Sequence, residues 1–429
     1  MLQGLLEWSI AAAAAAVVLM AAGVAFSALR FGGRRAGVSG DHDALAGSRF
    51  TIPVSVIVPI ERGRDARAAA QRAAALLNLK YPEFEVIVVA DASGDGSLEG
   101  IKAAWELAPN EFFYRQALKT ASVQRIYRST RDTRLLLVEK EPAGRSDALN
   151  CGVNLARYRY ATIVDLDVLF DPDALLRAMA APLADPASVV AATCHVECGG
   201  PSQGWRGAFD YLASARALME SRVVWKGMAN GVGPDAHVFV FRRDALLQLG
   251  GFSPRAADAG LDAMSRLQER TEDIDGAALP GVVRTSELFG RVDPAQPRPW
   301  SPIRRQRALL ETLRTLAEGE QPSAALRYLT ASRVIAPLAA GWFVAGTFAG
   351  AAAGRLPWHA VALAVVAVSF GQAAISTAAL LLRGSAPGGP EGGQLTRLVL
   401  AAPFEAAVRG PVTAFARLAA IFTLARRRR

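Results

Sequence analysis

Residues 84–96 read FEVIVVADASGDG, a largely apolar run that ends in an acidic, glycine-rich turn. A similar run, VSVIVPI, occupies residues 54–60, and residues 65–79 between the two have helical spacing. Short continuous apolar runs are typical of strands that are buried on both faces, as in parallel sheets. A strand, a helix and a second strand joined by short connections predict a right-handed β-α-β unit.

The alternation of strands and helices continues downstream of this unit. Such alternation predicts an α/β fold, with a mostly parallel sheet and helices on both faces. Further strands are expected at residues 135–139, 162–164 and 189–193, and further helices at residues 146–158 and 172–179.

The N-terminal stretch is apolar. Residues 10–29 carry no charge, and Arg30, Arg34 and Arg35 follow them. About 20 apolar residues cross the hydrocarbon core of a bilayer, and basic flanks stay on the cytoplasmic side. The sequence therefore predicts a transmembrane anchor over residues 1–31 and a linker over residues 32–50.

Two more stretches, residues 334–354 and 358–382, are long and apolar enough to form a spanning helical hairpin. A last apolar stretch, residues 396–424, contains prolines and charges, so an interfacial or re-entrant helix is expected there. These features predict a C-terminal membrane domain over residues 330–429 and a cytoplasmic α/β domain over residues 51–320. The predicted protein is a multi-pass protein of the inner (plasma) membrane.

The chain is basic, with a formal net charge of +9 and a pI near 9.9. Its arginine clusters flank the apolar stretches rather than alternating with aromatic residues on one face. Attraction to anionic membrane lipid accounts for this pattern, and a nucleic-acid partner is not expected.

Acidic residues follow two of the predicted strands. In open α/β sheets, ligands bind outside the carboxyl ends of the strands, so Asp91 is a candidate ligand of a nucleotide; the alternative is a loop carboxylate that stabilises its own turn. Asp165 and Asp167 are two residues apart and would point to the same side of an extended chain. Two such carboxylates predict a site for Mg²⁺ or Mn²⁺ bound together with substrate phosphates, and the alternative is a solvated turn.

The segment upstream of these aspartates has the features of an anion site. It contains Gly144, which permits a tight turn, and Arg145, near the start of a predicted helix. Arginine side chains match phosphate oxygens, and the N-termini of helices favour anions. We therefore expect a phosphate group to bind next to Arg145.

A series of motifs in this order resembles the membrane-bound, processive-type family-2 glycosyltransferases, which include cellulose, hyaluronan and poly-N-acetylglucosamine synthases. The resemblance covers residues 53–313, and the predicted membrane layout is also similar. The motifs are VSVIVP at 54–59, VVADAS at 88–93, GRSDALN at 144–150, VDLD at 164–167, FRRD at 241–244 and GGF at 250–252.

This resemblance implies a GT-A-type nucleotide-binding domain and inverting transfer of a sugar from a nucleotide diphosphate sugar, often a UDP-sugar. It implies that Asp91 contacts the uridine and that Arg145, where a lysine is usual, contacts the donor phosphates. Asp165 and Asp167 would hold the ribose, the diphosphate and the Mg²⁺ or Mn²⁺ ion. The implied partners are a polysaccharide or lipid-linked acceptor and accessory export subunits.

The sequence departs from the family where the catalytic base is expected. The family's acidic pair falls on Ala259 and Gly260, so Asp258 and Asp262 are the nearest candidate bases. The literal TED at residues 271–273 is expected to follow a helix at residues 261–270 and to lead into a strand at residues 277–284. We therefore expect TED not to supply the base.

A second departure concerns the motif that clamps the acceptor. Gln306 and Arg307 resemble its beginning and are candidates for binding the nucleotide sugar, but the Arg-Trp pair that should follow is missing. Two main hypotheses remain open: an active glycosyltransferase, or a catalytically degenerate relative that serves as a nucleotide-sugar-binding or accessory subunit. A third is a membrane protein that uses the same fold for another purpose.

Overall fold

The architecture follows from a computed structural model of the chain. It describes residues 22, 51–60, 66–91, 97–111, 113–165, 168–197, 204–220, 236–256, 258–272, 281–292, 310, 330–384, 390 and 392–426. The predicted anchor and linker therefore lie outside the described residues, apart from Ala22.

One sheet organises the first part of the described chain. Its strands lie in the order β3-β4-β5-β2-β1-β6-β9-β8-β10-β7. The strands are β1 Val54–Ile60, β2 Phe84–Ala90, β3 Leu107–Pro109, β4 Val123–Ser129, β5 Leu135–Lys140, β6 Tyr160–Ile163, β7 Val168–Phe170, β8 Val189–Glu197, β9 Ala236–Arg242 and β10 Gly281–Val292.

The sheet is mixed, and the expectation of a mostly parallel sheet is wrong. β5, β2, β1 and β6 run parallel, as do β8 and β10. β9 runs antiparallel to both of its neighbours, and β3–β4, β4–β5 and β7–β10 are also antiparallel pairs. An alternating order of strands and helices predicts parallel strands only where two strands are joined by a single crossover helix. β9 follows a longer connection that includes a helix at Gly204–Glu220, so this order does not fix its direction.

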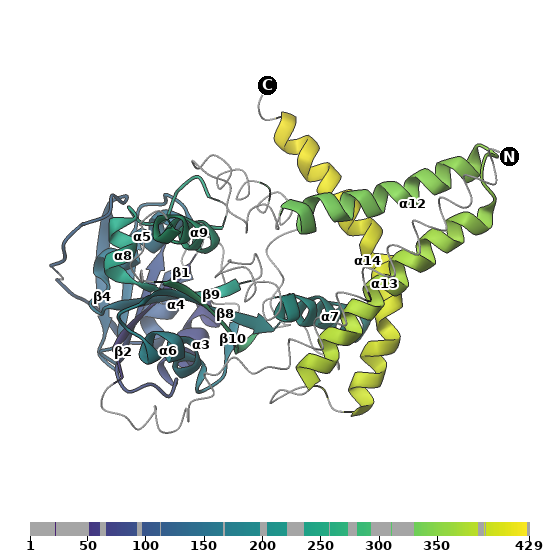
Figure 1. Cartoon of the computed structure of the whole chain (residues 1–429). Helices are drawn as coiled ribbons and strands as arrows, with labels where there is room; N and C mark the ends of the chain where they lie inside the picture. Colours follow the sequence, from purple (N-terminus) through teal and green to yellow (C-terminus); the bar gives the residue numbers. More distant parts are fainter. Residues whose placement is uncertain are drawn as a thin grey trace.

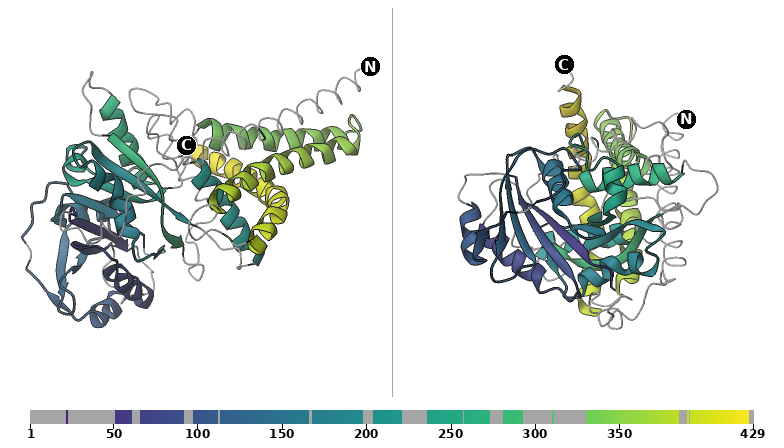
Figure 2. Two further views of the ribbon diagram at one scale, coloured as in Figure 1. Left: turned by 60° about the horizontal axis from the view of Figure 1, so that its bottom comes forward. Right: turned by 90° about the vertical axis from the view of Figure 1, so that its left-hand side faces the viewer.

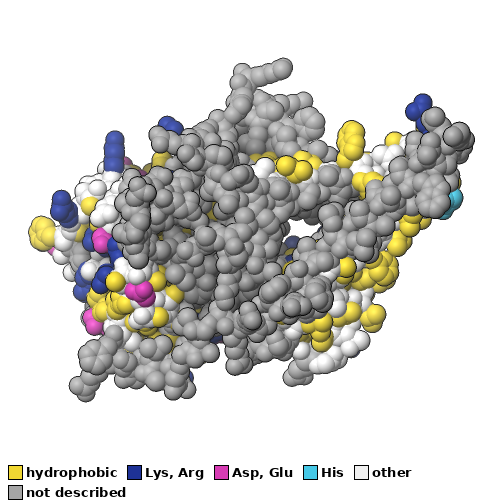
Figure 3. All heavy atoms as spheres, in the orientation of Figure 1, with side chains coloured by type: hydrophobic (Ala, Val, Ile, Leu, Met, Phe, Trp, Pro, Cys, Tyr) yellow, Lys and Arg dark blue, Asp and Glu magenta, His cyan; other side chains and the backbone are white. Residues whose placement is uncertain are grey.

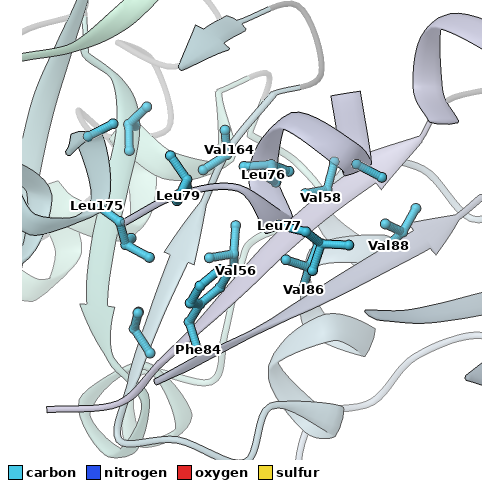
Figure 4. Packing of buried hydrophobic residues seen from close by; sticks show 14 of the residues in the cluster. Val56, Val58, Leu76, Leu77, Leu79, Phe84, Val86, Val88, Val164 and Leu175 are labelled. Carbon is cyan, nitrogen blue, oxygen red and sulfur yellow. The ribbon is translucent and has the colours of Figure 1, made fainter. Parts of the chain in front are cut away.

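Helices cover both faces of the sheet (Figure 1). Along β1, side chains alternate between the faces: Val56 and Val58 belong to the core cluster that includes α3, whereas Ile57 belongs to the cluster that includes α5. Figure 4 shows the first cluster, in which Leu76 lies near the valines of β1. The helices of this part are α3 Ala66–Leu77, α4 Ser97–Ala104, α5 Arg145–Leu155, α6 Ala174–Ala184, α7 Gly204–Glu220, α8 Arg243–Gln248 and α9 Ala259–Glu272.

Close packing fixes α5 on the sheet. A Cβ atom on Gly152 would lie 2.4 Å from Cγ2 of Ile57 in β1, so only a glycine permits this approach. α5 is therefore held directly on the central strands β1 and β2, and its first residue, Arg145, contacts Asp165 just beyond β6.

Three helices form the C-terminal part: α12 Ala336–Ala352, which follows a π-helical turn at Thr330–Ile335, α13 Trp358–Gly384 and α14 Gly392–Arg426. Among the described residues, one helix, Trp358–Arg383, is long and apolar enough to cross a membrane, and Trp342–Ala352 is a shorter apolar helix. The second predicted span thus coincides with α13. The first overlaps α12, and its ability to span a membrane stays a prediction.

The last apolar stretch lies within α14, one continuous helix from Gly392 to Arg426, and its interfacial or re-entrant placement stays a prediction. Pro403 and Pro411 lie within it, and the helix bends along its length (Figures 1 and 2). Proline bends helices without always ending them. The charged Glu405 is 2% exposed, and α14 packs on α13 and α7. A charge with a buried partner does not need to end an apolar helix.

Large apolar side chains remain exposed on the C-terminal helices. In Figure 3, hydrophobic side chains gather over these helices, whereas charged ones gather over the sheet. Trp342 on α12, Phe370 on α13 and Leu400 and Phe404 on α14 are each more than half exposed. The two parts of the chain thus present surfaces of different character.

Candidate functional site

The candidate site lies where four parallel strands end. β5, β2, β1 and β6 are neighbours with the same direction, so their carboxyl ends share one edge of the sheet. Asp91 follows β2, Lys140 ends β5, and Asp165 lies two residues beyond β6. Ligands of open α/β sheets bind at this type of edge. The structure therefore brings together side chains from segments that are far apart in the sequence.

Arg145 and Asp165 form an ion pair at this edge. Gly144, with φ of 95°, makes the turn that leads into α5, so Arg145 is the first residue of the helix. Their side chains are 30% and 37% exposed, so both remain accessible to a ligand. The two candidate residues are thus in contact, the binding of a phosphate by Arg145 stays a prediction, and Asp167 lies outside the described residues.

Asp91 is engaged by the protein itself. Its Oδ1 accepts hydrogen bonds from Nζ of Lys140 at 2.7 Å and from the amide of Ala143 at 2.9 Å. Its Oδ2 accepts one from the amide of Gly144 at 2.7 Å. The side chain is 9% exposed. Asp91 therefore binds the turn that precedes α5 rather than its own turn, and its contact with a nucleotide stays a prediction.

Lys140 is a residue of the site that sequence reasoning missed. Its side chain is fully buried, and Nζ lies 2.7 Å from carboxylate oxygens of both Asp91 and Asp147. Nζ also donates to the carbonyl of Glu141 at 2.6 Å. Burial alone would lower the pKa of Lys140, but the hydrogen bonds and charges of the two aspartates outweigh it and raise the pKa. The ammonium group therefore stays charged inside the domain.

Polar residues of α5 hold the neighbouring loops. Asp147 accepts a hydrogen bond from the amide of Ala121 at 3.1 Å, and Asn154 accepts one from the amide of Leu118 at 2.9 Å. The side chain of Asn150 donates to the carbonyl of Phe252 at 3.0 Å and accepts from its amide at 2.8 Å. These positions follow the helical repeat, so one face of α5 organises the rim of the site.

The glycine turn at residues 250–251, just before Phe252, fits closely against this face of α5. Gly251 has φ of +77°, and a Cβ atom there would lie 2.4 Å from Oδ1 of Asn150. Both the backbone conformation and the space require glycine. The motif GGF thus has a structural role beside the candidate site.

The two candidate bases lie at the start of α9. Asp258 accepts a hydrogen bond from the amide of Leu261 at 3.0 Å and so caps the helix. Asp262 is 3% exposed and accepts a hydrogen bond from Arg266 at 2.8 Å. Burial raises the pKa of Asp262, and the charge of Arg266 offsets part of this effect. Arg266 also donates to the carbonyl of Gly251 at 2.8 Å.

The start of α9 leaves no room for a carboxylate at one position of the expected acidic pair. A Cβ atom on Gly260 would lie 2.3 Å from the ring of Phe239 in β9. The expectation that TED follows the helix is wrong for its first two residues, because Thr271 and Glu272 belong to the last turn of α9. The predicted strand at residues 277–284 overlaps β10, Gly281–Val292, and residues 277–280 lie outside the described residues. Asp273, Gln306 and Arg307 lie outside the described residues.

The donor atoms at the site suit a hard divalent cation. In the described part of the chain, no group of three or more His, Cys, Asp or Glu side chains could hold a metal ion. Mg²⁺ and Mn²⁺ are often bound through one or two carboxylates and the phosphates of the substrate. Asp165, a partly exposed carboxylate next to Arg145, fits such a shared site.

Comparisons with known proteins bear on the family and the fold. Residues 118–249 match the model of the family described as Glycosyl transferase family 2, and this segment includes Lys140, Arg145 and Asp165. No curated protein matches the sequence. The mannosyltransferase PcManGT from Pyrobaculum calidifontis, solved in complex with GDP-Man and Mn²⁺, has a TM-score of 0.59 at 22% identity. That match covers 96% of this chain and 99% of the mannosyltransferase chain.

Two further solved structures are similar to a lower degree. TarS 1–349 from S. aureus, in complex with UDP-GlcNAc, has a TM-score of 0.40 at 13% identity, and the match covers 82% of this chain and 90% of TarS. Glucosyl-3-phosphoglycerate synthase from Mycobacterium tuberculosis has a TM-score of 0.40 at 12% identity, and the match covers 66% of this chain and 87% of the synthase. The family match and the fold together lead to one conclusion: residues 118–249 match glycosyltransferase family 2, and the chain has a GT-A-like fold.

Proposed function

We propose that this chain is a metal-dependent enzyme that transfers a sugar, with inversion, from a nucleotide diphosphate sugar to a polysaccharide or glycolipid acceptor. The observation that carries the proposal is the accessible pair of Arg145 and Asp165 at the carboxyl ends of the parallel strands. Both residues lie within the segment that matches the family. In this position the arginine suits the phosphate oxygens of a metal-bound diphosphate, and the carboxylate suits the metal ion.

The chemistry assigned to each residue follows from its charge. The guanidinium group of Arg145 would bind phosphate oxygens of the donor, supported by the amide groups at the N-terminus of α5. Asp165 and Asp167 would hold Mg²⁺ or Mn²⁺, which neutralises the charge of the departing nucleoside diphosphate when bound. Arg145 now contacts Asp165, so binding of the donor exchanges this contact for contacts with the phosphates.

We propose Asp258 rather than Asp262 as the base that accepts the proton of the acceptor hydroxyl. A general base must come within hydrogen-bonding distance of its substrate. Asp262 is 3% exposed and ion-paired with Arg266, whereas Asp258 is partly exposed at the start of α9. The variants Asp258→Asn and Asp262→Asn separate the two roles. Equal activity in both variants would discard the assignment of either residue.

The setting of the reaction is part of the proposal. We propose a multi-pass protein of the inner membrane whose catalytic domain faces the cytoplasm. α13 and the exposed apolar side chains of α12 and α14 support a membrane setting. Gln306 and Arg307 would contribute to binding of the nucleotide sugar, for which a UDP-sugar is proposed. Accessory export subunits are proposed as further partners.

One observation favours a second candidate function, that of an accessory subunit without turnover. Gly260 packs against Phe239 where the acidic pair of the family is expected, so this position cannot hold a carboxylate without repacking. Loss of a general base costs about 10²–10⁴ in rate. A protein of this kind would bind the nucleotide sugar and release no product.

Turnover of a panel of donors separates the two candidates. The full chain in mild detergent, supplied with lipid extract and Mn²⁺, is assayed for release of nucleoside diphosphate from UDP-GlcNAc and GDP-mannose, among other donors. The transferase predicts acceptor-dependent release that Asp165→Ala abolishes and that Glu106→Gln, an exposed control, leaves intact. Binding of a donor without release by any panel member would support the accessory role instead.

A further inference from the structure

We propose that Asp91 and Lys140 are positioning residues: they hold the turn at residues 141–144 and thereby place the guanidinium group of Arg145, so that Asp91 does not read the base of the nucleotide. This inference rests on the proposed function of the site. It assigns a role to Lys140, and it replaces the contact with uridine that the family resemblance implies for Asp91.

The first argument is the number of protein groups already bound to Asp91. Three donors, the ammonium of Lys140 and the amides of Ala143 and Gly144, occupy both of its oxygens at 2.7 to 2.9 Å. A carboxylate has about four lone-pair sites, so three are used. With 9% of the side chain exposed, little of the group is left to face a ligand.

The second argument is where those bonds lead. The amide of Gly144 is one peptide unit from Arg145, and Gly144 has the positive φ that turns the chain into α5. A hydrogen bond to this amide therefore fixes the direction in which α5 begins. The carboxylate at the end of β2 thus acts on the phosphate-binding arginine through the backbone.

The third argument is the position of Lys140. Its ammonium group lies between Asp91 at the end of β2 and Asp147 in the first turn of α5, and it also binds the carbonyl of Glu141. Asp147 in turn binds the amide of Ala121. Because Lys140 is fully buried, it cannot touch a nucleotide. Any effect of this residue on the ligand must pass through the segments that it joins.

This arrangement predicts which ligands feel a change at Asp91. An asparagine at this position keeps the size of the side chain but turns one acceptor into a donor, which then faces donors of the protein. The turn shifts, and Arg145 loses its place. All ligands that carry a diphosphate should then weaken to the same degree, whether or not they have a base.

The test measures binding of three probes to the full chain in detergent by calorimetry: UDP, GDP and inorganic pyrophosphate, each with Mn²⁺. For Asp91→Asn we expect all three affinities to fall in parallel, by about 10- to 100-fold, as for the loss of one charge-assisted hydrogen bond. Lys140→Met/Asp147→Asn, which removes one charge of each sign, should also weaken all three in parallel. It provides the same readout if Asp91→Asn does not fold.

The possible outcomes are distinct. If Asp91→Asn weakens UDP and leaves pyrophosphate unchanged, Asp91 reads the base and the inference is overturned. If both variants bind all three probes as the unmodified chain does, neither residue positions the site. If the unmodified chain binds none of the probes, it is the proposed function that fails.

Discussion

A buried ion pair joins α7 to the C-terminal helices and offers a direct test of how the chain is held together. Arg216 on α7 donates from its two terminal nitrogens to both oxygens of Glu405 on α14, at 2.7 and 2.8 Å. It also donates to Oγ of Ser376 on α13 at 2.6 Å. The side chains of Glu405 and Arg216 are 3% and 17% exposed. The pair therefore lies between three helices and largely away from water.

The expected effects follow from the cost of leaving a charge unpaired. Glu405→Met or Arg216→Met should lower the free energy of unfolding by about 3–5 kcal/mol, because each leaves its partner charged and buried. The double variant Arg216→Met/Glu405→Met should lose much less, since it also removes the desolvation cost of both charges. Glu106→Gln, in an ion pair whose side chains are more than half exposed, should change stability by about 0.5 kcal/mol or less.

The assay is denaturant unfolding of the full chain in one fixed mild detergent, followed by tryptophan fluorescence. A shift of the midpoint without a change of slope reports a change of stability. The single variants should unfold at lower denaturant concentration than the double variant. Single variants that unfold together with the unmodified chain would show that the pair is hydrated, and the described packing of α7 on α14 would be refuted.

Three further predictions concern the sheet domain. Gly260→Ala should destabilise the protein by about 1–3 kcal/mol, because its Cβ atom would overlap the ring of Phe239; denaturant unfolding measures this, and an unchanged midpoint would contradict the packing. Asp262→Asn should flatten the pH dependence of the melting temperature. Burial raises the pKa of Asp262 despite Arg266, so the folded state binds the proton more tightly than the unfolded state does. The stability of the unmodified chain should therefore fall as pH rises through the interval between the unfolded and folded pKa values of this group. An equally steep fall in the variant would show that another group is responsible. Asn150→Ala removes both hydrogen bonds to the backbone after the glycine turn and should cost about 1–3 kcal/mol; amide hydrogen exchange that stays slow in this turn would argue against the assignment.

Much of the central sheet could be predicted from the sequence. β1 and β2 lie where the two apolar runs indicated, at Val54–Ile60 and Phe84–Ala90, because strands buried on both faces need a continuous apolar sequence. The direction of β9 could not be predicted. It depends on the path of the chain through α7, and no local pattern encodes that path.

The candidate site was predictable in part. Arg145 and Asp165 were identified because a glycine turn before a helix and an acid after a strand are local signals, and the structure places them in contact. Lys140 was missed, because a lysine at the end of an apolar strand has the same local pattern as a solvated one. Its role depends on Asp91 and Asp147, which only the folded chain brings to it.

The burial of charges in α14 could not be predicted for a related reason. In sequence, Glu405 and Arg409 appear as charges that an apolar helix cannot bury. In the structure, each has a partner on α7, Arg216 for Glu405 and Asp210 for Arg409. Partners almost 200 residues away leave no signal in a local window.

The central claim is that the shared edge of the parallel strands binds a nucleoside diphosphate together with a divalent cation. Its most direct test is a calorimetric titration of the full chain with UDP and with GDP, each in the presence and absence of Mn²⁺, repeated with Asp165→Ala. We expect saturable binding of at least one nucleotide that requires Mn²⁺ and is lost in the variant. Binding that is equally strong in Asp165→Ala, or no binding of either nucleotide, would contradict the account.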